Sequence, residues 1–546
     1  MSRRVGLALG LLALVLFWMV GYPLVLTLAE SLGGPRWSLA SYAEFARRPA
    51  EWHALWASLW ISIATVVLSA AVGVPLAFLF ERTEFPGRRA LGTLVALPVA
   101  LPPLIGVIAF LFLYGESGFA SRAVQAALRL EHPPWRLTGP TAILFVHAYS
   151  MYVYFYLFTR AGLARLDGAY LEAAASLGAS RGRTLRTVTL PLLRPALGGA
   201  ALLTFMTSLS SFSAPYVFGG SFRVMTTQIV ASKLNGDTGL ALVETVTLAV
   251  LGFAGLALLR RSESTRTVAG AVRGAAPRRR TFQGGGIAVA AAGWLLAALL
   301  LLPHATLILV SFVPRNTWTV EALPPVLRLE NYAALFATPE RLRPIVNSLW
   351  MACAATAGAA LLGFGAAYGA VRRRGRLGAA LETLVAAPWA LPGTVFAIAL
   401  AAAFSVHRPA QLRFVLVGTA AILPLGYLVR SLPLTGRAAA AGLRQMDPAL
   451  EEAAASLGAG PGRRFRRVVV PHLRPALAAG ASLAFLAAVG DFVVSIVLYT
   501  FDTRPISIEI LSSLRLQEIG VAAAYGVLLT ALSIAGFLAF GREETK

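Results

Sequence analysis

Long apolar runs separated by short polar segments dominate the chain. Each run has about 20 residues, the length that spans a bilayer as an α-helix, and none shows the alternation typical of a membrane β-strand. The runs predict twelve transmembrane helices in two sets of six, at residues 5–30, 54–80, 91–114, 138–159, 195–217, 239–259, 285–311, 344–370, 379–405, 413–430, 475–499 and 519–541. The sequence therefore predicts an all-α polytopic membrane protein.

Composition supports this interpretation. Of the 546 residues 57% are hydrophobic and 13% are charged, whereas soluble domains carry about 25% charged residues. The first apolar run, 5–30, is too long for the core of a signal peptide, and no small-residue cleavage site follows it. We therefore expect this run to be the first span.

Arginine placement predicts the orientation in the membrane. The chain start, the chain end and segments 81–90, 160–194, 260–281, 371–378 and 430–474 together hold 32 basic and 10 acidic residues, which is 22 of the net charge of +23. Loops rich in Lys and Arg face the cytoplasm. We expect a multi-pass protein of the prokaryotic cytoplasmic (inner) membrane with both termini in the cytoplasm. Charge spread over short loops between spans indicates contact with membrane lipid rather than nucleic acid.

The sequence also repeats internally. Residues 58–60, Ser-Leu-Trp, recur at 348–350, and the proline-containing segment 97–110 resembles 387–400. Because each half has six spans, the halves have the same orientation and should be related by a pseudo-twofold axis along the membrane normal. The predicted organisation is a first half at 1–260, a cytoplasmic linker at 261–284 and a second half at 285–546.

The clearest repeat lies in two polar loops, 160–194 and 430–474. Within them, residues 171–197 and 451–477 are identical at 18 of 27 positions without a gap. In the first loop we expect a short helix, a turn at Gly178, a second helical stretch ending at Pro191, and Pro195 in the first turn of the next span. One such basic segment could simply lie on anionic lipid. Two nearly identical copies in equivalent places indicate two equivalent protein partners.

The motif in these loops resembles the signature of binding-protein-dependent ABC importer permeases. That signature is Glu-Ala-Ala, three residues, Gly, nine residues, a β-branched apolar residue, one residue, and Leu-Pro. The first copy fits throughout, from Glu172 to Pro191, and the second, from Glu452 to Pro471, departs only in having Val470 where the signature has Leu.

The resemblance implies the MetI-like fold of type I importers, with two permease halves fused as in ferric-iron and thiamine importers. It implies that each loop forms a coupling helix that docks on a cytoplasmic ABC ATPase, so that two ATPase copies and an external solute-binding protein are the expected partners. The residues implied in ATPase coupling are Glu172, Ala173, Ala174, Gly178, Pro191, Glu452, Ala453, Ala454, Gly458 and Pro471.

The chain should bind no cofactor and should not be an enzyme. A Walker A loop needs Gly-Lys-Ser/Thr, but Leu234 follows Lys233, and the other lysine, Lys546, is the last residue. ATP and Mg therefore belong on the separate ATPase subunits. The single cysteine, Cys353, forms no disulfide framework, and no Cys/His metal cluster occurs.

Two other functional classes are weaker interpretations. A secondary carrier can also have twelve helices, but it does not need two glycine-broken loops after the fourth span of each half. A membrane-embedded enzyme would need a nucleophile–base pair or a metal-binding constellation, and the sequence presents neither.

A few polar residues in the spans are candidates for the translocation pathway. Asp491, near the middle of a predicted span, could face the pathway or make a structural hydrogen bond between helices. Glu244, about one turn into its span, could serve as a gate, as a contact for the binding protein or as a snorkelling surface group. Ser210, Ser211 and Ser213 could line a polar path or let helices pack closely. His147 and His304 are more typical of packed residues.

The substrate is less clearly indicated. Residues 213–229 and 490–510 resemble ferric-iron importer permeases most, and the segment 490–496 is also similar to polyamine permeases, whose halves are separate chains. Ferric iron is therefore the first expectation, and thiamine, polyamines and phosphonates are the alternatives. No metal site is expected on this chain.

Overall fold

The computed structural model describes residues 3–34, 37–96, 98, 102–264, 280–281, 286–317, 323–372, 375–406 and 415–541. Helices make up nearly all of this described chain, together with one parallel pair of two-residue strands, β1 (Thr83–Glu84) and β2 (Arg280–Thr281). The predicted linker, 261–284, falls largely outside the described residues. The helical membrane architecture expected from the sequence is confirmed.

The two halves contain matching helices. The first half has α1 (Arg3–Leu16), a π-helical turn (Phe17–Gly21), α2 (Tyr22–Ser31), α3 (Ala40–Arg47), α4 (Pro49–Arg82), α5 (Arg88–Leu94), α6 (Pro103–Tyr114), α7 (Phe119–Leu128), α8 (Gly139–Ala164), α9 (Gly168–Ser176), α10 (Arg181–Thr184), a π-helical turn (Leu185–Thr189), α11 (Leu190–Leu209), α12 (Ser213–Phe218), α13 (Met225–Leu234) and α14 (Thr238–Ser264). The second half has α15 (Gly286–Ser311), α16 (Glu330–Ala337), α17 (Pro339–Arg372), α18 (Arg376–Ala390), α19 (Gly393–Phe404), α20 (Ile422–Gln445), α21 (Pro448–Ser456), α22 (Pro461–Arg464), a π-helical turn (Phe465–Val469), α23 (Val470–Val489), α24 (Val493–Leu498), α25 (Ile506–Arg515) and α26 (Ile519–Gly541).

The repeat extends to individual hydrogen bonds. The helices α4 and α17 both have 34 residues, and each carries a serine that receives the first backbone N–H of a later helix. The hydroxyl of Ser58 accepts a hydrogen bond from Met225 at 2.7 Å, and that of Ser348 accepts one from Ile506 at 2.8 Å. These serines belong to the repeated Ser-Leu-Trp segments, so the sequence repeat is a structural repeat.

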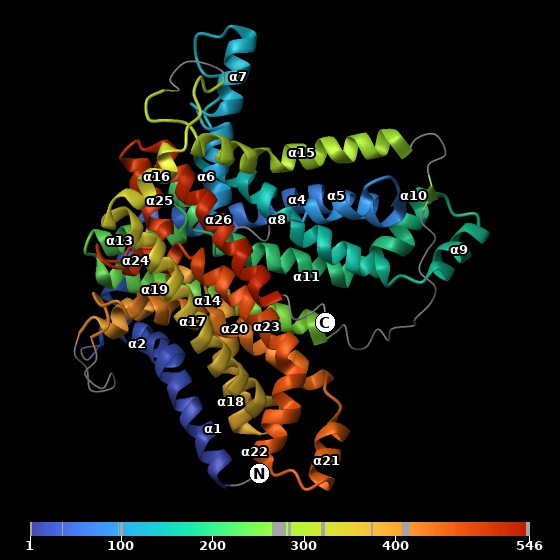
Figure 1. Cartoon of the computed structure of the whole chain (residues 1–546), viewed down its shortest axis with the longest axis vertical. Helices are drawn as coiled ribbons and strands as arrows, with labels where there is room; N and C mark the ends of the chain where they lie inside the picture. The colour runs from blue at the N-terminus through green and yellow to red at the C-terminus, as the bar shows by residue number, and fades with distance from the viewer. Residues whose placement is uncertain are drawn as a thin grey trace.

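The first helices of the two halves are exchanged. In Figure 1, α1 lies beside α18 of the second half, whereas α15 lies along α5 and α6 of the first half. The indole ring of Trp18 lies 5.1 Å from the ring of Phe404 in α19. In the opposite direction, Trp294 of α15 packs near Gly87, at the start of α5. The two halves therefore hold each other through their first spans.

The predicted spans correspond to helices, but several of their bounds differ. Ten helical segments among the described residues are long and apolar enough to cross a membrane, and the bent pair α18–α19 makes an eleventh. The tenth predicted span, 413–430, corresponds to α20, which begins at Ile422 and continues to Gln445. The predicted boundary was wrong because Arg430 ends the apolar run in the sequence, whereas the helix continues through it.

Four predicted spans are broken rather than continuous. The helix axis turns by 114° between α18 and α19, where Pro392 follows Leu391, since proline disfavours the α conformation in the residue before it. The span predicted at 91–114 corresponds to two separate helices, α5 and α6. The spans predicted at 195–217 and 475–499 end early, because α11 stops at Leu209 and α23 stops at Val489.

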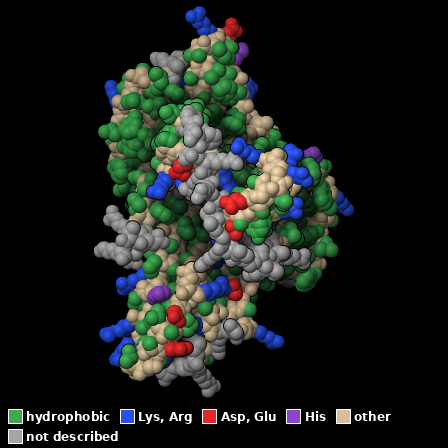
Figure 2. Space-filling view, turned by 90° about the vertical axis from the view of Figure 1, so that its right-hand side faces the viewer, with side chains coloured by type: hydrophobic (Ala, Val, Ile, Leu, Met, Phe, Trp, Pro, Cys, Tyr) green, Lys and Arg blue, Asp and Glu red, His purple; other side chains and the backbone are tan. Residues whose placement is uncertain are grey.

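The outer surface is strongly apolar. Figure 2 shows broad areas of hydrophobic side chains and separate groups of charged ones. Large exposed apolar residues occur on several long helices, for example Leu11 on α1, Val67 on α4 and Leu295 on α15. Apolar areas of this extent mark contact with lipid or protein, as expected for a polytopic membrane protein.

Candidate functional site

The two polar loops have the same local structure. Asp167 and Asp447 cap α9 and α21, because each carboxylate accepts a hydrogen bond from the N–H group two residues later, at 3.0 Å and 2.9 Å. Gly178 and Gly458 follow these helices with φ angles of +72° and +78°. This left-handed conformation strains residues with a side chain, so both glycines are needed for the turn that the sequence predicted.

After the turn, the chain continues differently from the expectation. The N–H group of Leu190 donates to the carbonyl of Leu185, and a π-helical turn joins α10 directly to α11. Pro191 and Pro195 therefore lie within one helical rod that begins at Arg181. The prediction that Pro195 marks the first turn of the span was wrong, because the π-turn lets a helix continue past Pro191, which has no N–H group.

The repeated residues present an accessible surface. Glu172, Ala173 and Gly178 are exposed, as are their counterparts in the second loop, whereas Ala174 is buried and Ala454 is half-buried. In Figure 1, α9 and α21 lie at the far ends of separate sets of helices. The second loop is also held by an ion pair between Glu451 and Arg372, at the end of α17.

Two leucines in these loops were not predicted as functional. Leu177 is 87% exposed and Leu457 is 88% exposed, and each occupies the C-cap of its short helix. Single exposed apolar residues are common, but these two occupy equivalent places beside the repeated motif, which makes them candidates for contact with a partner. Residues 176–178 and 456–458 are both Ser-Leu-Gly. This identity between the two loops is the sequence signal that could have pointed to the two leucines.

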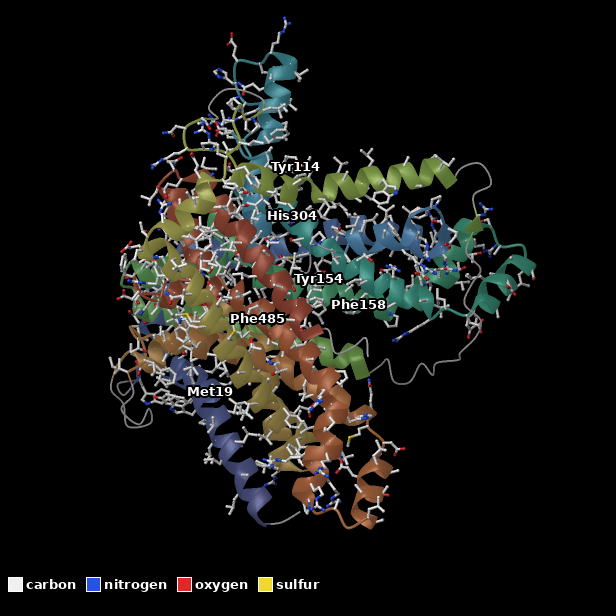
Figure 3. The ribbon with its side chains drawn as sticks, viewed as in Figure 1. Met19, Tyr114, Tyr154, Phe158, His304 and Phe485 are labelled. Carbon is white, nitrogen blue, oxygen red and sulfur yellow. The ribbon has the colours of Figure 1, made fainter. Side chains whose placement is uncertain are left out.

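A cavity of about 310 Å³ lies where the two halves meet. It brings Asp491 of the second half together with Ser210, Ser211 and Ser213 of the first. Tyr154 of α8 and His304 of α15, labelled in Figure 3, lie in the central part of the molecule. The polar residues of the cavity wall are His147, Tyr149, Ser150, Tyr154, Thr207, Ser210, Ser211, Ser213, His304, Arg430 and Asp491.

The carboxylate of Asp491 accepts hydrogen bonds from Arg430 and from the N–H groups of Val494 and Ser495. Its Oδ2 accepts a hydrogen bond of 2.7 Å from the guanidinium of Arg430, and its Oδ1 accepts one of 2.8 Å from the N–H group of Val494. Asp491 lies in the break before α24, not in the middle of a span as expected. The ring of Pro102, from the other half, approaches Gly490 closely enough that a Cβ atom there would lie 2.7 Å from it.

The equivalent place in the first half contains hydroxyl groups and a histidine. Ser211 is the counterpart of Asp491, and Ser150 is the counterpart of Arg430. His147 Nε2 lies 2.8 Å from Ser211 Oγ, and Tyr149 Oη lies 3.1 Å from His304 Nδ1. The cavity is therefore chemically asymmetric, with an ion pair on one side and neutral polar groups on the other.

Glu244 does not line this cavity. It is fully buried in α14, where its Oε1 accepts a hydrogen bond of 2.7 Å from Ser232 of α13. Glu51 of α4 is also buried and accepts a hydrogen bond of 3.0 Å from Gln228 of α13. The surface position considered for Glu244 is excluded, and its contacts hold helices α13 and α14 together.

Arg430 was missed as a cavity residue. In the sequence it is the first arginine of the basic segment 430–474, and it was assigned with that segment to the membrane surface. In the structure Arg430 lies in the third turn of α20, which begins at Ile422, and it lines the cavity. The sequence did not show that one helix continues through residue 430, and this continuation is what places Arg430 at the cavity.

Comparison with known proteins gives a family and several relatives. Residues 71–267 and 359–542 match the family described as binding-protein-dependent transport system inner membrane component. The probable ABC transporter permease protein y4fN of Sinorhizobium fredii is 32% identical over 549 residues, covering 98% of this chain and 96% of that protein. The ferric transport system permease protein FbpB of Actinobacillus pleuropneumoniae is 28% identical over 497 residues, covering 89% and 70%. The molybdenum transport system permease protein ModB of Mycobacterium tuberculosis is 33% identical over 209 residues, covering 38% and 74%.

The family match occurs twice, once in each half, and covers more than half of the chain. Both polar loops lie within the matched residues, as do the serines and the aspartate of the cavity. The chain therefore belongs to the binding-protein-dependent transport system inner membrane components, the permease subunits of ABC transporters.

Proposed function

We propose that the chain forms the complete membrane pathway of an ABC importer, with both permease halves in one polypeptide. A solute delivered by an external binding protein passes between the halves, and ATP hydrolysis on separate subunits drives the transport. The single observation that carries this proposal is the doubled loop, because Leu177 and Leu457 are exposed at equivalent positions beside the Glu-Ala-Ala motifs.

Two closely similar loops favour two ATPase copies, one for each loop. Their location on the arginine-rich segments supports a cytoplasmic position for the loops and for both termini. The exposed Glu172 and Glu452 offer negative charge to basic groups of the ATPase, while the adjacent leucines offer apolar contact.

The cavity between the halves is the proposed translocation pathway. Asp491, Ser210, Ser211 and Ser213 line it, which agrees with their selection from the sequence. Glu244 is not proposed for the pathway wall, because it is buried between α13 and α14. Its role is to hold α13 and α14 together through Ser232.

For the substrate, we propose ferric iron as the first candidate. The long similarity to a ferric transport permease supports it, and the shorter similarity to a molybdenum transport permease places inorganic ions in general among the candidates. Thiamine, polyamines and phosphonates are the alternatives from the sequence. The ligand that co-purifies with the cognate binding protein identifies the substrate directly.

Crosslinking tests the docking of the two loops. Cysteines replace the exposed Ala175 and Ala455, one at a time, in a Cys353→Ser background, and each should crosslink to the partner ATPase. The matched control is Ala126→Cys on α7, which is also exposed and lies on the predicted external side. Labelling of residue 175 or 455 from the periplasm would contradict the proposed topology.

A functional variant tests the coupling itself. Glu172→Ala combined with Gly178→Asp should uncouple transport from ATP hydrolysis without unfolding the membrane helices, because both positions are exposed. If the loop lies only on lipid, uptake by the stably expressed double variant stays at the wild-type level.

A further inference from the structure

Three arginines follow one another along a single face of α20. Arg430, Arg437 and Arg444 are spaced at intervals of seven residues in this helix. Seven residues make nearly two helical turns and advance the axis by about 10 Å. The three side chains therefore form a ladder that leads from the cavity at Arg430 toward the loop that contains α21.

Arg437 and Arg444 line a second cavity. This cavity has a volume of about 700 Å³ and is formed by α17, α18 and α20 of the second half together with Leu256 of α14 from the first. The guanidinium of Arg437 lies 3.8 Å from the ring centroid of Trp389. The first cavity lies between the halves, the second lies in the second half with Leu256 as its contact with the first, and one face of α20 lines both.

The charge presented to these cavities is positive. In the ion pair between Arg430 and Asp491, both residues line the first cavity, and the arginine side chain is 35% exposed whereas the aspartate side chain is 6% exposed. Arg444 lies 3.7 Å from Glu382 in an exposed pair. Among the described wall residues, the two carboxylates are Asp491, which pairs with Arg430, and Glu382, which pairs with Arg444.

The fold itself does not require this ladder. The equivalent positions of α8 in the first half are Ser150, Leu157 and Ala164, and α8 packs in its half without any of the three charges. Charged residues at membrane depth are costly and mark pathways for ions or solutes. Ser210 lines the same cavity as Arg430, and its hydroxyl group can donate a hydrogen bond to a negatively charged solute.

We propose that this arginine ladder guides an oxygen-rich anion through the permease, either a free oxyanion or a metal ion held in an anionic complex. Guanidinium groups bind carboxylate and phosphate-like oxygens through paired N–H donors, whereas a bare cation is repelled by them. The inference rests on the proposed function, because it assumes that the space between the halves is the pathway. It narrows that function by excluding uncomplexed Fe³⁺, thiamine and polyamines as substrates.

The test uses the complete complex of this chain, its ATPase and its binding protein in proteoliposomes. Radiolabelled molybdate, ferric citrate and thiamine are the probes, and uptake is measured together with ATP hydrolysis. Uptake of molybdate supports a free oxyanion, and uptake of ferric citrate supports an anionic metal complex. Uptake of thiamine, with neither anion transported, overturns the inference.

The variants address the ladder directly. Arg437→Gln should lower uptake of the anionic probe about tenfold, while Arg437→Lys should retain a substantial part of it and stimulated ATP hydrolysis should persist in both. The double variant Arg430→Gln with Asp491→Asn removes both charges of the ion pair and should also lower uptake. Arg47→Gln, an exposed arginine on α3, is the matched control and should transport normally. Uptake by Arg437→Gln within about twofold of wild type overturns the inference.

Failure of the proposed function gives a different result. If the binding protein does not stimulate ATP hydrolysis by the wild-type complex, the assignment as an importer is wrong, and the ladder inference fails with it. If the binding protein stimulates ATP hydrolysis but none of the probes is taken up, the ligand released from the binding protein is identified by mass spectrometry. A cationic ligand contradicts the ladder, and an anionic one supports it.

Discussion

The ring centroid of Phe212 lies 5.7 Å from that of Phe492, the residue at the equivalent position of the other half. Both side chains are buried, and both lie in the breaks that follow α11 and α23. Tyr216 lies against both rings, at 5.0 Å and 5.9 Å. The aromatic contact therefore joins the two halves in the wall of the cavity, which includes both Phe212 and Phe492.

This contact should act as a seal. Phe492→Ala removes a large ring from the contact, so a cysteine placed at Ser210 in the cavity should become reactive toward a membrane-impermeant thiol reagent added outside. The measurement is the labelling rate of Ser210→Cys in a Cys353→Ser background, with and without Phe492→Ala. Phe145→Ala, at an exposed aromatic residue of α8, is the control and should not change the rate. Equal rates in all three proteins would show that the rings do not close the cavity.

The ion pair of Asp491 and Arg430 should show strong energetic coupling. Asp491→Asn keeps an oxygen for the N–H group of Val494 but leaves the guanidinium unpaired, which should cost about 1–3 kcal/mol of stability. Asp491→Ala also loses the cap of α24 and should cost about 1 kcal/mol more. The double variant with Arg430→Gln should recover most of the loss from Asp491→Asn. Thermal unfolding of the detergent-purified variants measures these differences, and purely additive effects would contradict the coupling.

The exposed leucines of the two loops should matter for partner binding and not for stability. Leu177→Asp and Leu457→Asp alter side chains that make almost no contact within the chain, so the melting temperature should stay close to that of wild type. Co-purification of the ATPase should fall sharply in both variants. Leu128→Asp, at the exposed end of α7, is the matched control and should leave co-purification intact. A loss of folding in the loop variants would show that the leucines have a structural role.

Close helix packing should depend on a glycine in each half. A Cβ atom at Gly73 of α4 would lie 2.4 Å from the carbonyl oxygen of Tyr152, and one at Gly363 of α17 would lie 2.3 Å from Oγ1 of Thr435. Gly73→Ala and Gly363→Ala should each destabilise the protein by about 1–3 kcal/mol, since the helices must move apart. Gly106→Ala is the control, because a Cβ atom there meets nothing within 4 Å. Unchanged melting of both variants would mean that the helices separate at little cost.

The amino-acid sequence by itself determined the local properties of this protein. The length and apolarity of each run predicted the spans, and the repeated Glu-Ala-Ala segments predicted the loops, because hydropathy and motif spacing are readable along a single stretch of chain. Asp491 and the serines near Ser211 could be selected as candidates for the same reason, since polar groups in apolar runs are conspicuous.

The tertiary structure decided which of these residues meet. It placed Asp491 beside Arg430 in a cavity, placed Glu244 in a helix contact, and exchanged α1 and α15 between the halves. Such contacts join residues far apart in the chain, and they depend on helix breaks, tilts and close packing that single stretches of sequence do not encode. Arg430 shows the difference most clearly, because its charge assigned it to the membrane surface, whereas the continuation of α20 placed it inside.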